Sequence, residues 1–205
     1  LVKYNPETKE ESYYLQKDRM PKFMLQTTLN SFKPYKQGVV FKEFLSDSVY
    51  LIQGENYRPF MHFNFGEEYF WKGKALSYDF QEGMAEIQRS GKVWQISSII
   101  GNRMVYLRCN TTQSIRTYRS YLLDRKSGNQ VELDFSKSPE ENFSFEAHIW
   151  YQDQLVISMS SSDVGELLGQ LEKGQYSFEG GGSLASIESS ENPALMFITF
   201  KNSLK

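Results

Sequence analysis

The sequence predicts an all-β protein, and more narrowly a β-propeller built from four-stranded antiparallel blades. Three observations support this prediction. Aromatic residues make up 15% of the 205 residues, and aromatic side chains favour strands. Short apolar and β-branched runs alternate with turns of Gly, Asn, Asp and Ser along the chain. A similar apolar run recurs about every 40–55 residues, which is the size of one propeller blade.

Hairpins are expected wherever two such runs flank a short polar turn. The Gly101–Asn102 turn between two apolar runs is the strongest of these signals. The predicted hairpins join 1–4 to 12–15, 38–44 to 48–52, 93–100 to 103–109, 115–123 to 130–135 and 144–150 to 154–158. Two further strands are predicted over 59–65 and 194–200.

Three short helical segments are expected beside these strands. The segment 78–89 has apolar residues at helical spacing and Gly91 as a C-cap. Asp163 is positioned to cap a second helix over 164–172, and 183–189 forms one further turn or short helix. We interpret these helices as additions to a β-fold.

The recurring apolar runs lie near residues 1, 48, 104, 155 and 195, which leaves room for about four blades in a single domain over 1–205. A β-sandwich would explain the frequent turns but not the long period. Either the ring has four blades or the chain is part of a larger ring. Because the chain opens within a strand pattern, we expect a propeller that is incomplete at its N-terminus.

Two segments carry motifs. The first is Asp47-Ser48-Val49-Tyr50-Leu51-Ile52, followed by Arg58-Pro59-Phe60-Met61-His62-Phe63-Asn64-Phe65-Gly66. The second is the tail from 187 to 201, with Glu188-Ser189-Ser190-Glu191-Asn192-Pro193-Ala194-Leu195 at its centre. These segments resemble the blade pattern D-x-V-Y-x-I … P-x-Y-x-x-D-F-G and the C-terminal signature E-x-x-N-P-x-L of a family of Bacteroidetes lipoproteins. Phe60 and Asn64 replace the family's usual Tyr and Asp.

The resemblance implies the C-terminal part of a six-bladed propeller of unknown function. It also implies an exported, lipid-anchored protein of the periplasm or outer membrane, whose signal peptide, lipidated cysteine and first blades precede Leu1. Contact with the membrane would then occur only through this anchor. Cys109, deep in the chain, cannot be the lipidated residue, and its apolar surroundings predict a buried structural thiol.

Composition and motifs exclude several function classes. The net charge of −2 argues against a nucleic-acid partner bound by phosphate neutralisation. The two histidines, His62 and His148, lie far apart, and the sequence has no metal-ligand spacing or nucleotide-binding loop. We therefore expect no metal, no cofactor and no catalytic residue, so an enzyme is the less favoured interpretation.

The candidate ligand-binding residues are Arg116, Tyr118, Arg119, Tyr121 and His62. On a strand over 115–123, Arg119 and Tyr121 share one face, and Arg116 and Tyr118 share a face two residues apart. Such ribbons of Arg and Tyr bind anions, glycans or proteins. A solvent-exposed outer strand would explain the same residues without a ligand.

The resulting functional hypothesis is a non-catalytic binding or scaffold propeller at the bacterial cell envelope, contacting a protein or a glycan. The alternative is a propeller hydrolase or lyase that acts on a glycan or peptide at the central channel. An incomplete ring would also leave an open blade face through which the chain could self-associate. The residues expected in the core are Val49, Leu51, Val105, Leu107, Val156 and Phe197.

Overall fold

Three antiparallel sheets form most of the structure, a computed structural model that describes residues 2–13, 32–43, 45–73, 80–111, 117–172, 174–180 and 182–200. The first sheet has the order β3-β4-β5-β6 and follows a separate hairpin, β1–β2. The strands are β1 Val2–Tyr4, β2 Glu11–Tyr13, β3 Phe32–Tyr35, β4 Gly38–Lys42, β5 Ser48–Gln53 and β6 Asn56–His62. The all-β prediction is confirmed.

The second sheet is another four-stranded meander, and a short ribbon follows it. The strands of this sheet are β7 Gln95–Ile100, β8 Met104–Asn110, β9 Arg119–Asp124 and β10 Gln130–Leu133. The ribbon pairs β11 Ser136–Ser138 with β12 Glu141–Asn142. Gly101 lies in the predicted turn between β7 and β8, so the strongest hairpin signal of the sequence is confirmed.

The third sheet has three strands, β13 Phe145–Tyr151, β14 Gln154–Met159 and β15 Ala194–Ile198. The apolar runs near 155 and 195 are therefore neighbours in one sheet, paired through Ile157 and Met196, and do not begin separate blades. The described residues consequently contain three larger sheets rather than four. The sequence period was misleading here because an insertion of about 35 residues separates two strands that pair directly.

That insertion contains two helices, α2 Ser161–Gly169 and α3 Leu184–Glu188. The predicted cap of α2 was wrong: its N-cap is Ser160, whose hydroxyl accepts the backbone N–H of Asp163 at 3.3 Å. Hence the helix begins three residues before 164. The other helices are α1 Phe80–Ser90, within one residue of the predicted end, and the short η1 Gly66–Glu68. None of the helices in the described ranges is long and apolar enough to span a membrane.

Two apolar layers separate the three sheets, and the middle strand β8 contributes to both. Val105, Leu107 and Cys109 face the first layer, whereas Tyr106 faces the second. This alternation follows from the period of two along a strand and buries both faces of the second sheet. The predicted buried thiol is confirmed, because Cys109 is only 1% exposed.

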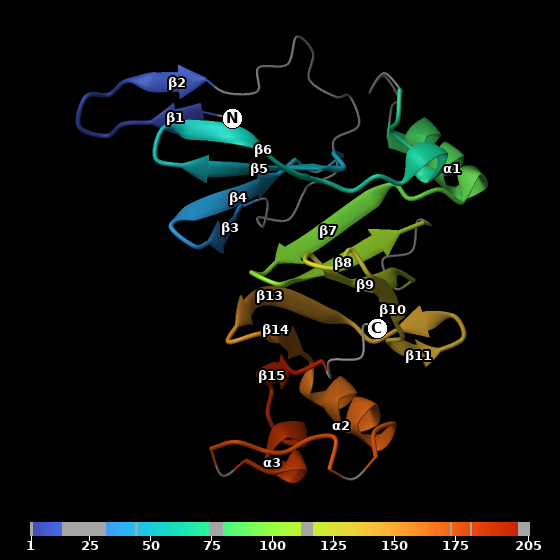
Figure 1. The fold of residues 1–205 in the computed structure, drawn as a ribbon. Coiled ribbons are helices and arrows are strands. Elements are labelled where there is room, and N and C mark those ends of the chain that lie inside the picture. The colour runs from blue at the N-terminus through green and yellow to red at the C-terminus, as the bar shows by residue number, and fades with distance from the viewer. Residues whose placement is uncertain are drawn as a thin grey trace.

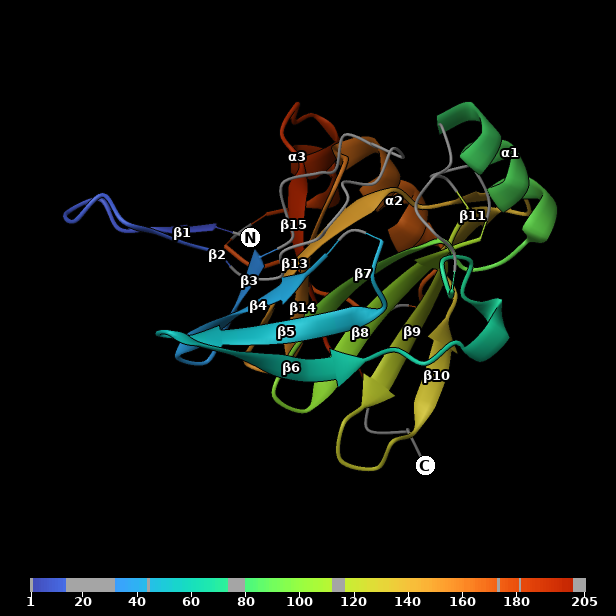
Figure 2. The ribbon, with the colours of Figure 1, turned by 90° about the horizontal axis from the view of Figure 1, so that it is seen from above.

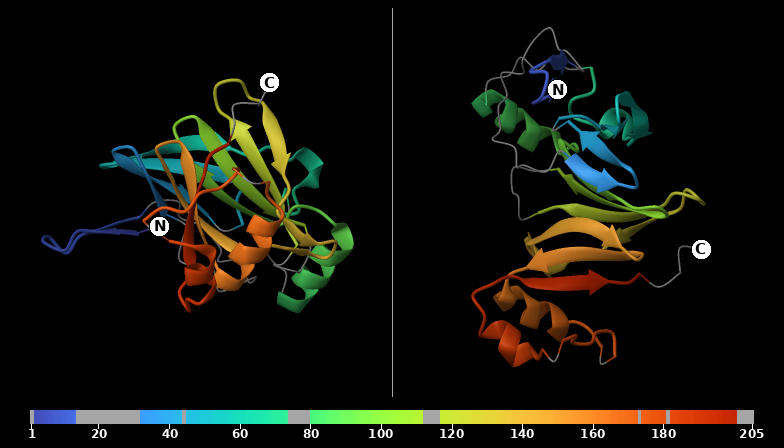
Figure 3. Two further views of the ribbon diagram at one scale, coloured as in Figure 1. Left: turned by 90° about the horizontal axis from the view of Figure 1, so that it is seen from below. Right: turned by 90° about the vertical axis from the view of Figure 1, so that its left-hand side faces the viewer.

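The sheets are arranged as a fan. Figure 1 shows the first sheet above, the second in the middle and the third below, and β7 and β13 lie side by side. Figure 2 shows that the strands of the second sheet cross beneath β5 and β6 at an angle. The right panel of Figure 3 shows the three sheets in succession, with α2 and α3 beyond the third. The arrangement in the described residues is a stack of antiparallel sheets with no closed ring.

Five of the six predicted core residues are buried, and the exception is Phe197 on β15. Its side chain is 47% exposed, because β15 is the edge strand and Phe197 lies on the face of the sheet that points away from the second apolar layer. Val156, its partner on the central strand β14, shares that face and is buried. The prediction failed because the sequence pattern marks an apolar face without showing whether another sheet covers it.

Candidate functional site

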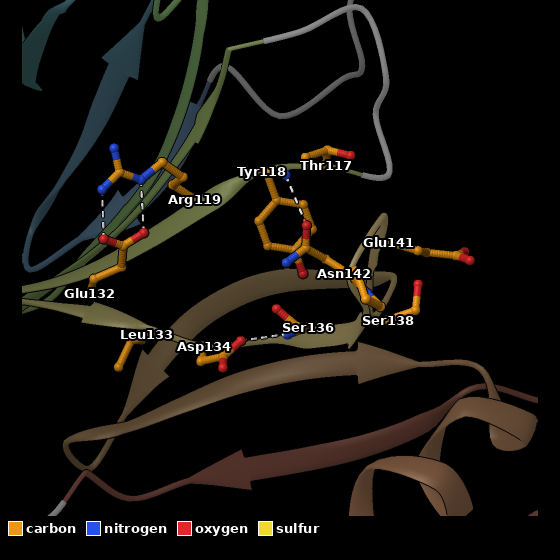
Figure 4. Close-up of a pocket in the computed structure, with 11 residues that line it drawn as sticks. Thr117, Tyr118, Arg119, Glu132, Leu133, Asp134, Ser136, Ser138, Glu141 and Asn142 are labelled. Atoms are coloured by element: carbon orange, nitrogen blue, oxygen red, sulfur yellow. Dashed lines mark hydrogen bonds and ion pairs between the residues drawn. The ribbon is translucent and has the colours of Figure 1, made fainter.

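A polar pocket lies between the second sheet and the β11–β12 ribbon (Figure 4). It encloses about 420 Å³. The side chains around it carry hydroxyl, amide, carboxylate and guanidinium groups. The lining residues are Thr117, Tyr118, Arg119, Glu132, Leu133, Asp134, Ser136, Ser138, Pro139, Glu141 and Asn142.

One wall of the pocket is the β11–β12 ribbon, which local side-chain bonds hold in place. Where the chain leaves β10, the Asp134 carboxylate accepts the backbone N–H of Ser136 at 2.9 Å. This Asx-type turn redirects the backbone into the ribbon. The amide oxygen of Asn142 accepts the N–H of Tyr118 at 3.0 Å, and the Thr117 hydroxyl donates to the Glu140 carbonyl at 3.3 Å. The ribbon is thereby tied to the start of β9.

The opposite wall carries a bidentate ion pair between neighbouring strands. Arg119 Nε lies 2.8 Å from one carboxylate oxygen of Glu132, and Nη2 lies 2.7 Å from the other. Both side chains are about half exposed. Because the Arg119 guanidinium is planar and Glu132 accepts two of its N–H groups, the pair fixes the orientation of both side chains.

Two carboxylates of the pocket are held in the ionised form. The hydrogen bond from Arg119 lowers the pKa of Glu132, and the hydroxyl and N–H of Ser136 lower the pKa of Asp134. With Glu141, the lining contains three carboxylates and one guanidinium. The pocket is therefore acidic and rich in hydrogen-bond acceptors at neutral pH.

Tyr118 forms the floor of the pocket and is part of the core. Its side chain is buried, and its hydroxyl donates to the carbonyl of Phe143 at 2.6 Å. The guanidinium carbon of Arg108 lies 3.9 Å from the centre of the Tyr118 ring. Burial raises the pKa of Tyr118 well above its ordinary value. The Tyr118 ring therefore packs in the second apolar layer beneath the pocket and is not exposed to solvent.

The remaining sequence-predicted site residues lie in different places. Arg119 and Tyr121 share one face of β9, as predicted, with the guanidinium 5.4 Å from the Tyr121 ring. Tyr121 packs against the first apolar layer and does not line the pocket. His62 lies on β6, where its Nε2 is 3.0 Å from Asp47, away from the pocket lining. Arg116 lies outside the described residues.

The sequence reasoning missed most of the polar lining, including Glu132, Asp134 and Asn142. One signal was present in the sequence, because residues 134–142 form a short polar segment containing Pro139 between two strand runs. The pairing of β9 with β10 brings Arg119 near Glu132, and the sequence of neither strand alone specifies that register. The described residues contain no group of three or more His, Cys, Asp or Glu placed to hold a metal ion.

No protein-family model matches the sequence, and no curated protein matches it. A crystal structure of a Bacteroides fragilis protein described as exported is similar in fold, with a TM-score of 0.53 and 12% sequence identity. The similarity covers 84% of this chain and 49% of that one, so this chain spans about half the length of its structural neighbour. At this identity the likeness shows the fold alone: a succession of antiparallel sheets that also occurs within a longer protein.

Proposed function

We propose that this protein is a non-catalytic binding module of the bacterial cell envelope, and that the pocket beside the β11–β12 ribbon holds part of a glycan. The observation that carries the proposal is the lining itself, which combines carboxylates, hydroxyls, an amide and a guanidinium in one hollow. Sugar hydroxyls both donate and accept hydrogen bonds, so they match such a mixed set of partners.

The ionised carboxylates determine which ligand atoms fit. Glu132 and Asp134 can only accept hydrogen bonds in this form, and vicinal hydroxyls of a sugar can donate to them. Arg119 has donors beyond the two that bind Glu132, and these can reach a ring or hydroxyl oxygen. Since the ion pair already holds both side chains, little side-chain entropy is lost when a ligand binds.

The same carboxylates favour binding over hydrolysis at this site. Glycoside hydrolysis requires one carboxyl group that stays protonated near neutral pH, with its pKa raised by burial. In this pocket the pKa values of Glu132 and Asp134 are both lowered. Neither Glu132 nor Asp134 therefore meets this requirement for a general acid.

The proposal also covers how the three sheets are arranged. We infer that the three sheets are blades of a β-propeller, because successive sheets pack face to face and the first strands of the second and third sheets lie side by side. The neighbour described as exported supports export of this chain to the envelope. The lipid anchor and the six-bladed ring are extensions suggested by the sequence resemblance.

A glycan array probed with the purified chain tests the binding proposal. We expect binding to a subset of glycans, and at least tenfold weaker binding for Glu132→Gln, which removes a charge from the pocket. Glu179→Gln is the matched control, because Glu179 is exposed and does not line the pocket. Circular dichroism establishes that each variant is folded.

Two outcomes would overturn the proposal. One is the absence of binding to every glycan on the array. The other is equal loss of affinity for Glu132→Gln and Glu179→Gln. Recovery of the bound glycan in shortened form would instead favour the hydrolase or lyase alternative.

A further inference from the structure

The third sheet ends at an edge strand that has no protection against pairing with another strand. β15 has the sequence Ala-Leu-Met-Phe-Ile and contains no charged residue, proline or glycine. Its only partner among the described strands is β14. Natural proteins usually protect such edges with charges, prolines or bulges, because an unpaired row of N–H and C=O groups binds other strands.

The other sheet edges show these protective features. The first sheet ends at β6, which contains Arg58 and Pro59, and the second ends at β10, which contains Glu132. At the opposite edge of the first sheet, β3 contains Lys33 and Pro34. β13 has a register shift beside Ala147, and β7 lies against β13. Among the described sheets of three or more strands, β15 is therefore the one edge with neither a protective residue nor an adjacent strand of another sheet.

An exposed apolar surface adjoins this edge. Leu195 is 64% exposed and Phe197 is 47% exposed, and both lie on the face of the sheet that points away from the second apolar layer. The Phe197 ring contacts Tyr151 with 6.4 Å between ring centres, and Ile149 extends the surface along β13. An exposed apolar patch of this kind marks an interaction surface.

We propose that β15 pairs antiparallel with β15 of a second copy and joins the two third sheets into one continuous sheet. Pairing about Met196 places Leu195 of each copy opposite Phe197 of the other, so the exposed apolar residues of both copies form one surface. The strand is uncharged, so no like charges meet in its paired region.

A second copy fits this edge better than an unrelated partner, because a two-fold axis makes each copy both donor and acceptor of the same edge. β15 of each copy is uncharged and apolar, so it can pair with β15 of the other copy without burying a charge. The interaction does not involve the polar pocket, whose residues belong to β9–β12 and the segments beside these strands. Dimerisation and glycan binding are therefore separate properties.

Sedimentation velocity of the 205-residue chain from about 1 to 100 μM tests this interaction. We expect a monomer–dimer equilibrium for the natural sequence and a dissociation constant at least tenfold higher for Leu195→Lys, which places a charge beside the paired edge. Val131→Lys is the matched control, because it introduces the same charge at an exposed apolar residue of another edge strand, β10, outside the proposed surface. We expect it to retain dimerisation.

Amide hydrogen exchange gives an independent readout. In the dimer, the outward N–H groups of β15 should exchange more slowly as protein concentration rises, whereas those of β6 should not change. A monomer at 100 μM would overturn the proposal. So would equal dissociation of Leu195→Lys and Val131→Lys, since that result would show that the added charge weakens the association wherever it lies, and not by its place on β15. Thermal melting verifies that both variants are folded.

Discussion

The second and third sheets contain similar apolar patterns but bury them to different extents. On β8, Val105, Tyr106 and Leu107 are successive residues, and all three are buried although they point to alternate faces. On β15, Leu195 and Phe197 are among the most exposed apolar side chains of the described chain. The second sheet lies between two others, whereas the third has a neighbouring sheet on one face only. Burial thus depends on what lies opposite a face and not on the composition of the strand.

The largest test of this comparison is the same substitution in each sheet. Leu107→Ala removes a side chain that is 4% exposed in the first apolar layer, and we expect a loss of about 2–5 kcal/mol in unfolding free energy. Leu195→Ala, on the open face, should cost less than about 0.5 kcal/mol at protein concentrations where the chain is monomeric. Urea denaturation measures both values. Similar losses for the two variants would show that the third sheet is covered in solution.

A smaller effect is expected at the contact between the second and third sheets. A Cβ atom added to Gly101 would lie 2.7 Å from Cγ of Trp150, whose indole N–H donates to the Ile99 carbonyl at 2.9 Å. Gly101→Ala must displace this ring, so we expect a loss of about 1–3 kcal/mol. Gly169→Ala in α2 is the control, because its added Cβ would meet nothing within 4 Å. If both variants unfold at the same temperature as the natural sequence, the Trp150 ring can move aside at no cost.

A buried hydroxyl offers a finer comparison of the same two sheets. Tyr118→Phe removes the donor to the Phe143 carbonyl and leaves that buried oxygen without its 2.6 Å partner. We expect a loss of about 1–2 kcal/mol. The corresponding change on the third sheet, Tyr151→Phe, affects a side chain that is 50% exposed and should cost almost nothing. Chemical denaturation distinguishes these outcomes, and equal costs would contradict the different burial of the two tyrosines.

The smallest expected effect is a dependence of stability on alkaline pH. Burial raises the pKa of Cys109 to about 12, while an exposed thiol in the unfolded chain has a pKa of about 8.5. Between these values the folded state retains a proton that the unfolded state loses, so the Cys109 contribution to stability falls as pH rises. From pH 8.5 to 9.5 this amounts to about 1 kcal/mol.

The matched variant for this effect is Cys109→Ala, which removes the titrating group. The stability difference between this variant and the natural sequence, measured by denaturation at each pH, isolates the thiol from the lysines and tyrosines that also titrate in this range. We expect the difference to shift in favour of the variant as pH rises. A constant difference would indicate that the thiol is accessible and titrates equally in both states.

Local features of the chain were predictable because short-range interactions decide them. The Gly101–Asn102 turn, the helix over 80–90 and the shared face of Arg119 and Tyr121 all follow from the conformational preferences of adjacent residues. The candidate site was predicted only in part. Tyr118 and Arg119 line the pocket, but the carboxylates that give it its acidity come from other strands.

By itself, then, the sequence determined the strand-rich class, the positions of most turns and the alternation that gives each strand an apolar face. The tertiary structure alone decided that β14 and β15 are neighbours despite the helices between them, and that Phe197 is exposed while Val105 is buried. It also decided that Glu132 meets Arg119. The physical reason is that strand pairing and sheet packing join residues far apart in the chain, and no local preference of either partner specifies the register or the covering layer.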